Sequence, residues 1–225
     1  MQQNNQNIIR MRKRLFLLLL AFISLCQMNA VERTKLNFNG GWLLKVGDFP
    51  GAEQANYKDA GWKQITLPRA FNEKEAFKVS IEHLSDTIMW YRKHFHIQKV
   101  GDRKYFIEFE GVRFGADIWL NGKKVGYTEN GVMASGFDLT PYIIKGENVI
   151  AVRVDNSWNY RERTSGQRFQ WNDKNFNANY GGIPKNVFLH ITDKLHQTLP
   201  LYNNLKTTGI YIYGSNYDIA GKKVT

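Results

Sequence analysis

The dipeptide Asn121-Gly122 places the strongest local constraint on the fold of this chain. It separates two short runs, Asp117–Leu120 and Lys123–Tyr127, that carry aromatic and β-branched residues typical of strands. A two-residue type I′ turn needs φ > 0 at both central positions, and Asn-Gly meets this need most readily. The segment therefore predicts a β-hairpin over residues 117–127.

Strand-like segments recur at short spacing along the rest of the chain. Lys104–Glu110 alternates cleanly, with Tyr105, Ile107 and Phe109 on one face. No long segment shows a sustained helical period. Further strand candidates are Trp42–Leu44, Trp62–Leu67, Trp90–Ile97, Asn148–Asp155 and Asn186–Thr192. The aromatic residues expected in the core are Trp62, Trp90, Trp119, Phe109 and Phe137. Short strands separated by turns predict an all-β sandwich or jelly roll.

The chain has a formal net charge of +11, from 31 basic and 20 acidic side chains. Four of the basic residues, at positions 10, 12, 13 and 14, precede the first acidic residue. Elsewhere the basic side chains are interspersed with acids, and no basic stripe or nucleic-acid-binding motif is present. We therefore expect a solvated basic surface and no nucleic-acid partner.

The first 30 residues are typical of a secretory signal peptide. Basic residues precede an apolar run, Leu15–Leu25, that is shorter than the roughly 20 residues needed to span a bilayer. Met28-Asn29-Ala30 offers a small-residue cleavage site. We therefore expect an exported, periplasmic or secreted protein with no membrane contact after cleavage. An uncleaved anchor and lipidation of Cys26 are the alternatives.

Cys26 is the only cysteine of the chain. If it leaves with the signal peptide, the mature chain has neither a disulfide framework nor a zinc–cysteine site. His94 and His96 lie two residues apart on one strand face, where a metal could bind, but the sequence offers no third ligand. We expect no metal and no cofactor.

Several motifs, in order, resemble glycoside hydrolase family 2, the group of β-galactosidases, β-glucuronidases and β-mannosidases. They cover roughly residues 36–192. The motifs are Trp62-x-x-Ile65-x-Leu67-Pro68, Trp90-Tyr91-Arg92-Lys93-x-Phe95, Phe109–Val112, Ala116–Gly126, Phe137–Thr140, Asn148–Asn156 and Gly181–Val187. One departure is Pro184-Lys185, where many members carry an arginine.

The resemblance implies a jelly-roll β-sandwich of the galactose-binding-domain-like type over residues 31–195. In the family this N-terminal sugar-binding domain is followed by an immunoglobulin-like domain and then by a (β/α) barrel. Residues 196–225 resemble a connector and the truncated start of that immunoglobulin-like domain. These downstream domains are the expected protein partners.

The resemblance also implies that the catalytic residues lie elsewhere. A retaining glycosidase uses two carboxyl groups about 5–5.5 Å apart, and in this family both are glutamates of the barrel. We expect no catalytic residue in this chain, which alone should hydrolyse no glycoside.

Two long segments with little periodicity, residues 69–89 and 156–185, are candidates for functional or partner-facing loops. The resemblance implies that Asp155, at the end of a strand, holds sugar hydroxyls. The alternative is that Asp155 caps its own turn through Asn156 and Ser157. The substrate-binding residues predicted on and after this strand end are Asp155, Asn156, Trp158, Trp171, Asn172 and Asp173.

The aromatic and amide side chains of the second long segment suit a sugar, because aromatic faces stack on pyranose rings and amides bond hydroxyls. Packing of that loop on the sandwich or on the barrel is the alternative. Tyr160 adds aromatic surface, and Asn72 and Glu73 are weaker candidates. The sequence thus predicts the carbohydrate-binding module of an exported, β-galactosidase-like glycosidase. A stand-alone binding module and a purely structural docking module remain open.

Overall fold

The computed structural model describes residues 33–71, 86–129, 131, 133–168 and 181–198, and the single residues 214 and 221. Within these ranges there are twelve strands and no helix. The strands are β1 (Thr34–Asn37), β2 (Trp42–Val46), β3 (Lys63–Ile65), β4 (Arg69–Ala70), β5 (Ile88–Ile97), β6 (Arg103–Phe109), β7 (Gly115–Leu120), β8 (Lys123–Thr128), β9 (Ser135–Asp138), β10 (Gly146–Asp155), β11 (Gly182–Ile183) and β12 (Val187–Asp193). The predicted signal peptide and most of the predicted connector lie outside the described residues.

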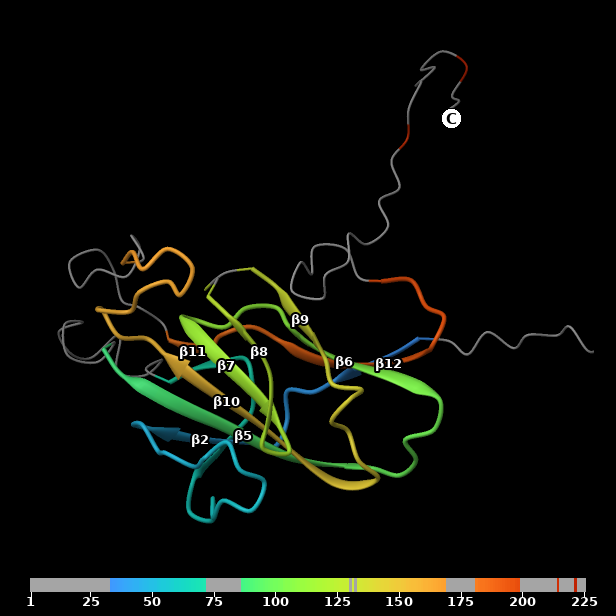
Figure 1. Cartoon of the computed structure of the whole chain (residues 1–225), viewed down its shortest axis with the longest axis horizontal. Coiled ribbons are helices and arrows are strands. Elements are labelled where there is room, and N and C mark those ends of the chain that lie inside the picture. The colour runs from blue at the N-terminus through green and yellow to red at the C-terminus, as the bar shows by residue number, and fades with distance from the viewer. Residues whose placement is uncertain are drawn as a thin grey trace, which may run out of the picture. The chain divides into compact units, whose positions relative to one another are not determined.

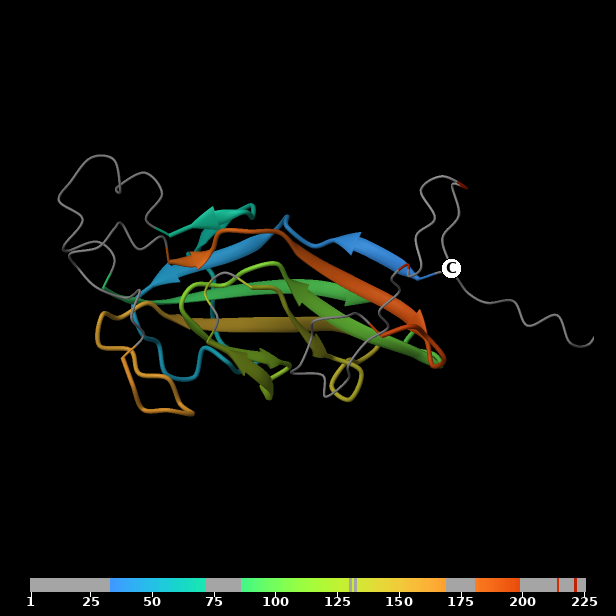
Figure 2. The ribbon, with the colours of Figure 1, turned by 90° about the horizontal axis from the view of Figure 1, so that it is seen from above.

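The strands form two main antiparallel sheets and one small one. The larger sheet has the order β3-β2-β5-β10-β7-β8, and the smaller has the order β1-β12-β6-β9. β4 and β11 pair separately as a two-stranded sheet. Figures 1 and 2 show the strands of both main sheets running along the same long direction. The predicted all-β jelly-roll sandwich is confirmed.

The hairpin predicted from Asn121-Gly122 is present between β7 and β8. Both residues have positive φ, 52° and 78° respectively, as a type I′ turn requires. The Asn121 amide also donates to the Tyr142 carbonyl and to Asn148 Oδ1, both at 2.9 Å. The turn residue therefore also ties the hairpin to the segment that leads into β10.

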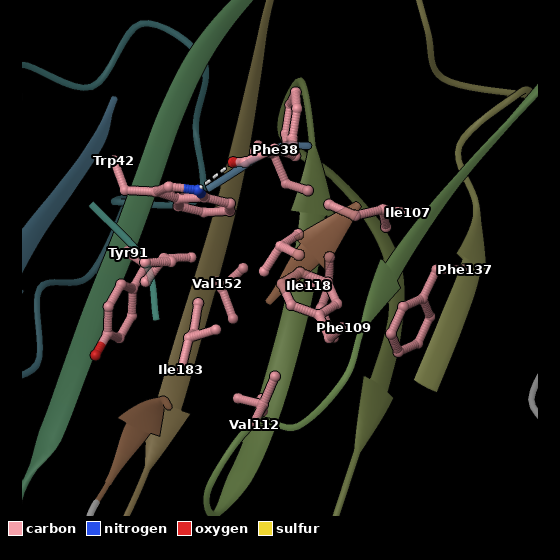
Figure 3. Close-up of a cluster of buried hydrophobic side chains, with 14 of the residues drawn as sticks. Phe38, Trp42, Tyr91, Ile107, Phe109, Val112, Ile118, Phe137, Val152 and Ile183 are labelled. Carbon is pink, nitrogen blue, oxygen red and sulfur yellow. Dashed lines mark hydrogen bonds between the residues drawn. The ribbon is translucent and has the colours of Figure 1, made fainter. Parts of the chain in front are cut away.

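Alternation of side chains across each strand divides the large sheet into an inner and an outer face. On β5, Met89 and Tyr91 belong to the core between the sheets, whereas Trp90 belongs to a second cluster on the outer face. Figure 3 shows the inner core, to which both sheets contribute. Its labelled members are Phe38, Trp42, Tyr91, Ile107, Phe109, Val112, Ile118, Phe137, Val152 and Ile183.

The loop between β2 and β3 covers part of the outer face of the large sheet. Ala52 and Trp62 from this stretch pack with Trp90 and Ala151, and partly buried Trp119 packs against them. The rings of Trp90 and Trp119 stack with centroids 5.4 Å apart. Of the five aromatic residues predicted to be core, Trp119 is the one that is only half-buried. It faces outward like Trp90, but it lies at the margin of the outer cluster as a partly buried member.

A fully buried arginine anchors this loop to the sheet. Arg92 of β5 donates from Nε to Asp59 Oδ2 at 2.7 Å and from Nη1 to the Gln54 carbonyl at 3.0 Å. Nη1 also bonds the Ala52 carbonyl. A buried guanidinium must be paired and hydrogen-bonded to be tolerated. The loop carbonyls and Asp59 meet most of this need, so the loop and the strand depend on each other.

His94, two residues further along β5, lies between two carboxylates. Its Nε2 is 2.8 Å from Asp59 Oδ2 and its Nδ1 is 2.7 Å from Glu147 Oε1. Burial alone would lower the pKa of His94, but the bonds to Asp59 and Glu147 outweigh it and raise the pKa above 6.5.

No group of three metal-ligating side chains occurs within the described ranges. No helix in those ranges is long and apolar enough to cross a membrane.

Truncation of a core isoleucine should cost far more than truncation of an exposed one. Ile107 is fully buried between the sheets, whereas Ile144 is 51% exposed. Ile107→Ala should lower the free energy of unfolding by about 2–5 kcal/mol through lost burial and the residual cavity. Ile144→Ala should change it by about 0.5 kcal/mol or less. Urea denaturation measures both, and equal losses would contradict the assigned core.

His94 should make stability fall as the pH rises. Because its folded pKa is raised, its contribution is complete below its unfolded pKa and is lost as the pH passes the folded pKa. Urea denaturation from pH 5.5 to about 9 should therefore show a decline above about pH 6.5 that His94→Asn removes. His96→Asn, on the same strand, leaves the bonds of His94 to Asp59 and Glu147 in place and should keep the decline. An unchanged pH profile in His94→Asn would refute this role.

Candidate functional site

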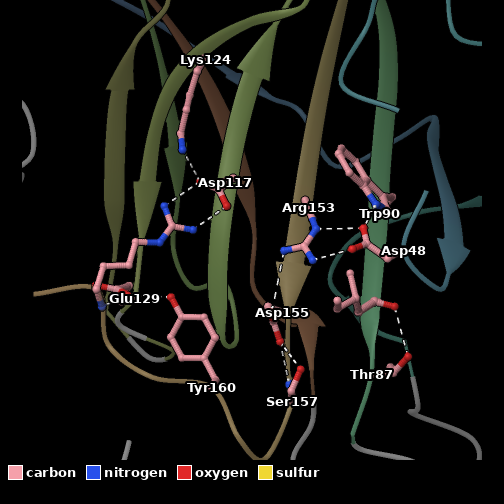
Figure 4. A network of polar contacts seen from close by, with 12 residues as sticks. Asp48, Thr87, Trp90, Asp117, Lys124, Glu129, Arg153, Asp155, Ser157 and Tyr160 are labelled. Atoms are coloured by element: carbon pink, nitrogen blue, oxygen red, sulfur yellow. Dashed lines mark hydrogen bonds and ion pairs between the residues drawn. The ribbon is translucent and has the colours of Figure 1, made fainter. Parts of the chain in front are cut away.

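The candidate site lies at one end of the large sheet, where β10 ends and its neighbours β5 and β7 begin. β10 ends at Asp155, which pairs with Ile88 at the start of β5 and with Gly115 at the start of β7. Antiparallel pairing therefore brings the end of one strand beside the beginnings of its two neighbours. Figure 4 shows the polar side chains gathered there.

Asp155 caps the turn that follows β10, which is the alternative role considered for it above. Its Oδ1 accepts from the backbone N–H of Ser157 at 3.0 Å and from the Ser157 hydroxyl. Its Oδ2 lies 3.8 Å from Nη1 of Arg153, and 23% of the side chain is exposed. One carboxylate oxygen thus shapes the chain after β10, while the other keeps acceptor capacity.

The two neighbouring candidates differ in exposure. Asn156 is fully buried, and its side chain packs so closely on Gly181 that a Cβ at 181 would lie 2.6 Å from it. Its backbone N–H donates to the Thr87 carbonyl at 2.9 Å. Trp158 is half-buried, and its backbone N–H donates to Asp86 Oδ1 at 2.9 Å. Trp158 can therefore present part of its ring to a ligand, whereas Asn156 supports the course of the chain.

Several predicted contacts fall outside the described residues. These are Trp171, Asn172 and Asp173 of the second long loop and the weaker candidates Asn72 and Glu73. Their predicted contacts with sugar, like those of Asp155, Asn156 and Trp158, stay predictions.

An aspartate–arginine pair lies beside Asp155 on the outer face. Arg153 donates from Nε to Asp48 Oδ1 at 2.9 Å and from Nη2 to Oδ2 at 2.7 Å. Trp90 Nε1 donates to the same Asp48 Oδ1 at 3.2 Å. The bond from Arg153 is the main cause that lowers the pKa of Asp48. This bidentate pair joins the loop after β2 to the strand that carries Asp155.

A second carboxylate clamps the segment that follows Asp155. Asp117 of β7 accepts from Arg163 through both oxygens, at 2.8 and 2.6 Å, and from Lys124 at 2.7 Å. Burial alone would raise the pKa of Asp117, but the bonds from Arg163 and Lys124 outweigh it and lower the pKa. The Arg163 guanidinium also lies over the Tyr127 ring, 4.7 Å from its centroid.

Glu129 holds the same segment at two further points. Its Oε1 accepts from the Tyr160 hydroxyl at 2.6 Å and from the backbone N–H of Arg163 at 2.8 Å. The Tyr160 ring lies over Gly115, where a Cβ would be 2.2 Å from the ring. Burial and the bond to Glu129 raise the pKa of Tyr160. Tyr160 is thus packed into the domain and does not supply the sugar-stacking surface expected of it.

The two carboxylates paired with arginine, Asp48 and Asp117, are poorly suited to acid catalysis. A glycosidase acid needs a raised pKa so that it is protonated near neutral pH, but Asp48 and Asp117 have lowered pKa values. In their ionised form these groups accept hydrogen bonds and fix neighbouring segments. The arrangement can position a binding surface, and in the described ranges it offers no set of ligands for a metal.

No sequence pattern predicted this network, because its partners are distant in the chain. Asp48 and Arg153 are 105 residues apart, and Asp117 and Arg163 are 46 residues apart. The proximity of Arg153 and Asp155 could have been predicted, because residues two apart on a strand lie on the same face.

Comparison with known proteins identifies the family of this chain. Residues 33–190 match the family described as glycosyl hydrolase 2 galactose-binding domain-like. A β-glucuronidase of Formosa agariphila is 40% identical over 205 residues, which are 86% of this chain and 21% of that protein. A β-galactosidase of Bacteroides ovatus is 31% identical over 172 residues, or 73% of this chain and 19% of that protein.

Solved structures agree with this result. The structure of a β-glucuronidase from glycoside hydrolase family 2 matches with a TM-score of 0.72 at 40% identity, over 84% of this chain and 21% of that chain. A family 2 member from Bacteroides cellulosilyticus gives a TM-score of 0.57 at 29% identity, over 72% and 21% respectively. The chain spans about a fifth of the length of these relatives. It belongs to the galactose-binding-like N-terminal domains of glycoside hydrolase family 2, as its motifs predicted.

Proposed function

We propose that this chain is the non-catalytic carbohydrate-binding module of an exported glycoside hydrolase, and that it meets carbohydrate at the strand end that carries Asp155. The main support is the family match over residues 33–190. The relatives named above are a β-glucuronidase and a β-galactosidase, and β-glycosides are therefore the ligand class. Export rests on the signal-like first 30 residues.

The geometry at the strand end suits a sugar. Asp155 uses Oδ1 in its own turn. Its Oδ2 lies 3.8 Å from Arg153 Nη1, which is too far for a hydrogen bond, so this oxygen can accept one from a sugar hydroxyl. The half-buried ring of Trp158 follows three residues later. A carboxylate accepts hydroxyl hydrogens and an aromatic ring stacks on a pyranose, so both residue types suit a sugar ligand.

Hydrolysis belongs to other domains in this proposal. The paired carboxylates of the site are held ionised by Arg153, Arg163 and Lys124. An immunoglobulin-like domain and a barrel with two catalytic glutamates are the partners that the family implies. In such an assembly the Asp155 end would face the active site, and this module alone would leave glycosides intact.

Calorimetric titration of the 225-residue chain with methyl β-galactoside and methyl β-glucuronide tests the binding role. Wild type should give saturable heat with at least one of them, and Trp158→Ala should weaken binding about fivefold, since lost stacking is worth about 1 kcal/mol. Trp158→Phe should restore most of the affinity. Trp171→Ala tests the sequence-predicted contact in the same way. No heat with either glycoside would sink the binding role and leave a docking module.

Loss of the Asp117 charge should loosen the segment after Asp155. Asp117→Asn removes the ionic partner of Arg163 and Lys124, a loss of about 1.5–3 kcal/mol for a charged hydrogen bond. Trypsin should then cut faster after Arg161, Arg163 or Arg168. Asp102→Asn, whose side chain is 89% exposed in its pair with Lys194, is the matched control and should leave the rate unchanged. Equal cleavage of Asp117→Asn and wild type would contradict the clamp.

A further inference from the structure

The outer face of the small sheet carries polar side chains that are buried. On β12, Val187 and Leu189 belong to the core between the sheets, so His190 and Thr192 project from the opposite face. The outer face of a two-layer sandwich is ordinarily open to water. His190 is nevertheless only 2% exposed and Thr192 only 1% exposed. Other parts of the chain therefore shield these two side chains from water.

His190 belongs to a cluster with an acid, a lysine and two aromatic rings. Its Nε2 lies 2.5 Å from Glu108 Oε2 on β6, and Lys35 Nζ on β1 lies 3.4 Å from the same oxygen. The Lys35 ammonium is also 3.7 Å from the centroid of the Phe188 ring. Phe106 of β6 pairs directly with His190. Both phenylalanines are only partly buried, so apolar surface flanks the polar pair.

The buried imidazole of His190 has one nitrogen in need of a partner. An ionised carboxylate only accepts hydrogen bonds, so the contact with Glu108 places a proton on Nε2. His190 Nδ1 is buried and makes no hydrogen bond within the described part of the chain. Such an atom is unfavourable when it stays unpaired. Nδ1 is an acceptor in a neutral ring and a donor in a charged ring, so a hydroxyl or a side-chain amide can satisfy it in either state.

The chain after β12 turns back over this face. Figure 1 shows the turn at the end of β12. The His196 ring lies against Phe106 of β6, with ring centroids 5.2 Å apart. The carbonyl of the next residue, Gln197, accepts a hydrogen bond from the guanidinium of Arg33, which directly precedes β1. Because β12 lies between β1 and β6 in the sheet, residues 194–198 run across the sheet instead of leaving it.

We propose that the outer face of the small sheet is a docking site for residues 199–205 of this chain. These residues lie outside the described ranges and continue directly from Thr198. Seven extended residues reach about 23 Å, whereas the strands of this four-stranded sheet, spaced about 4.8 Å apart, span about 14 Å. The segment is therefore long enough to cross the whole face.

The composition of the segment matches the chemistry of the face. Its three leucines can cover the aromatic rings that flank the cluster. Tyr202, Asn203 and Asn204 carry a hydroxyl and two amides, the groups that can bond His190 Nδ1. Docking would bury apolar surface and pair the buried nitrogen together. It would also fix the course of the chain as it leaves the domain, whichever ligand the strand end binds.

Modification of histidines by diethyl pyrocarbonate, mapped by mass spectrometry, tests the docking in the 225-residue chain. His190 should react about tenfold or more slowly than His96, which is exposed on β5, because a docked side chain reacts only after local opening. L201D/L205D places two charges against the aromatic rings. It should raise the rate at His190 about fivefold or more and leave the rate at His96 unchanged.

A matched variant separates this segment from the rest of the tail. I210D/I212D introduces the same two charges five or more residues further on and should leave His190 protected. Rapid modification of His190 in wild type would overturn the docking site, and so would a slow rate that L201D/L205D does not change. Equal acceleration by I210D/I212D would contradict the assignment to residues 199–205. Protection that is lost on dilution would overturn it in favour of a second copy of the chain.

Discussion

The pairing of β10 with β5 on one side and β7 on the other is the constraint on which the rest of the structure depends. The ten-residue register with β5 places Val152 and Tyr91 in the core between the sheets. The same register sends Arg153 and Trp90 to the outer face. A slip by one residue would exchange the two faces. Core packing therefore fixes the positions of the polar side chains outside it.

On the outer face, ion pairs and hydrogen bonds add to the small apolar cluster around Trp62 and Trp90. Arg92 is fully buried under the loop after β2 because Asp59 and loop carbonyls accept its hydrogen bonds. Asp48 with Arg153 and Asp117 with Arg163 repeat the same principle at the strand end. In each case a side chain of the sheet secures a segment that has little regular structure of its own. These polar contacts tie the loops to the sheet at points outside the apolar clusters.

This arrangement has a functional consequence. The segment after Asp155 is fixed at Asp117 and Glu129, so the residues it presents are held by the sheet. A preorganised surface loses less conformational freedom when it binds a ligand. Trp158 lies on that segment, and the order of the segment is the physical basis for proposing it as a recognition surface. In that proposal the ligand class comes from the relatives and the place comes from the geometry of the strand end.

The sequence by itself determined the all-β fold, the hairpin at Asn121-Gly122 and the family, because alternation, turn residues and ordered motifs are local properties of the chain. It also named both roles open to Asp155, whose turn with Ser157 involves neighbours in sequence. Only the tertiary structure decided that Tyr160 and Asn156 are buried, that Trp119 faces outward, and that Asp117 meets Arg163. These depend on which distant strands lie side by side, and no local pattern encodes such contacts.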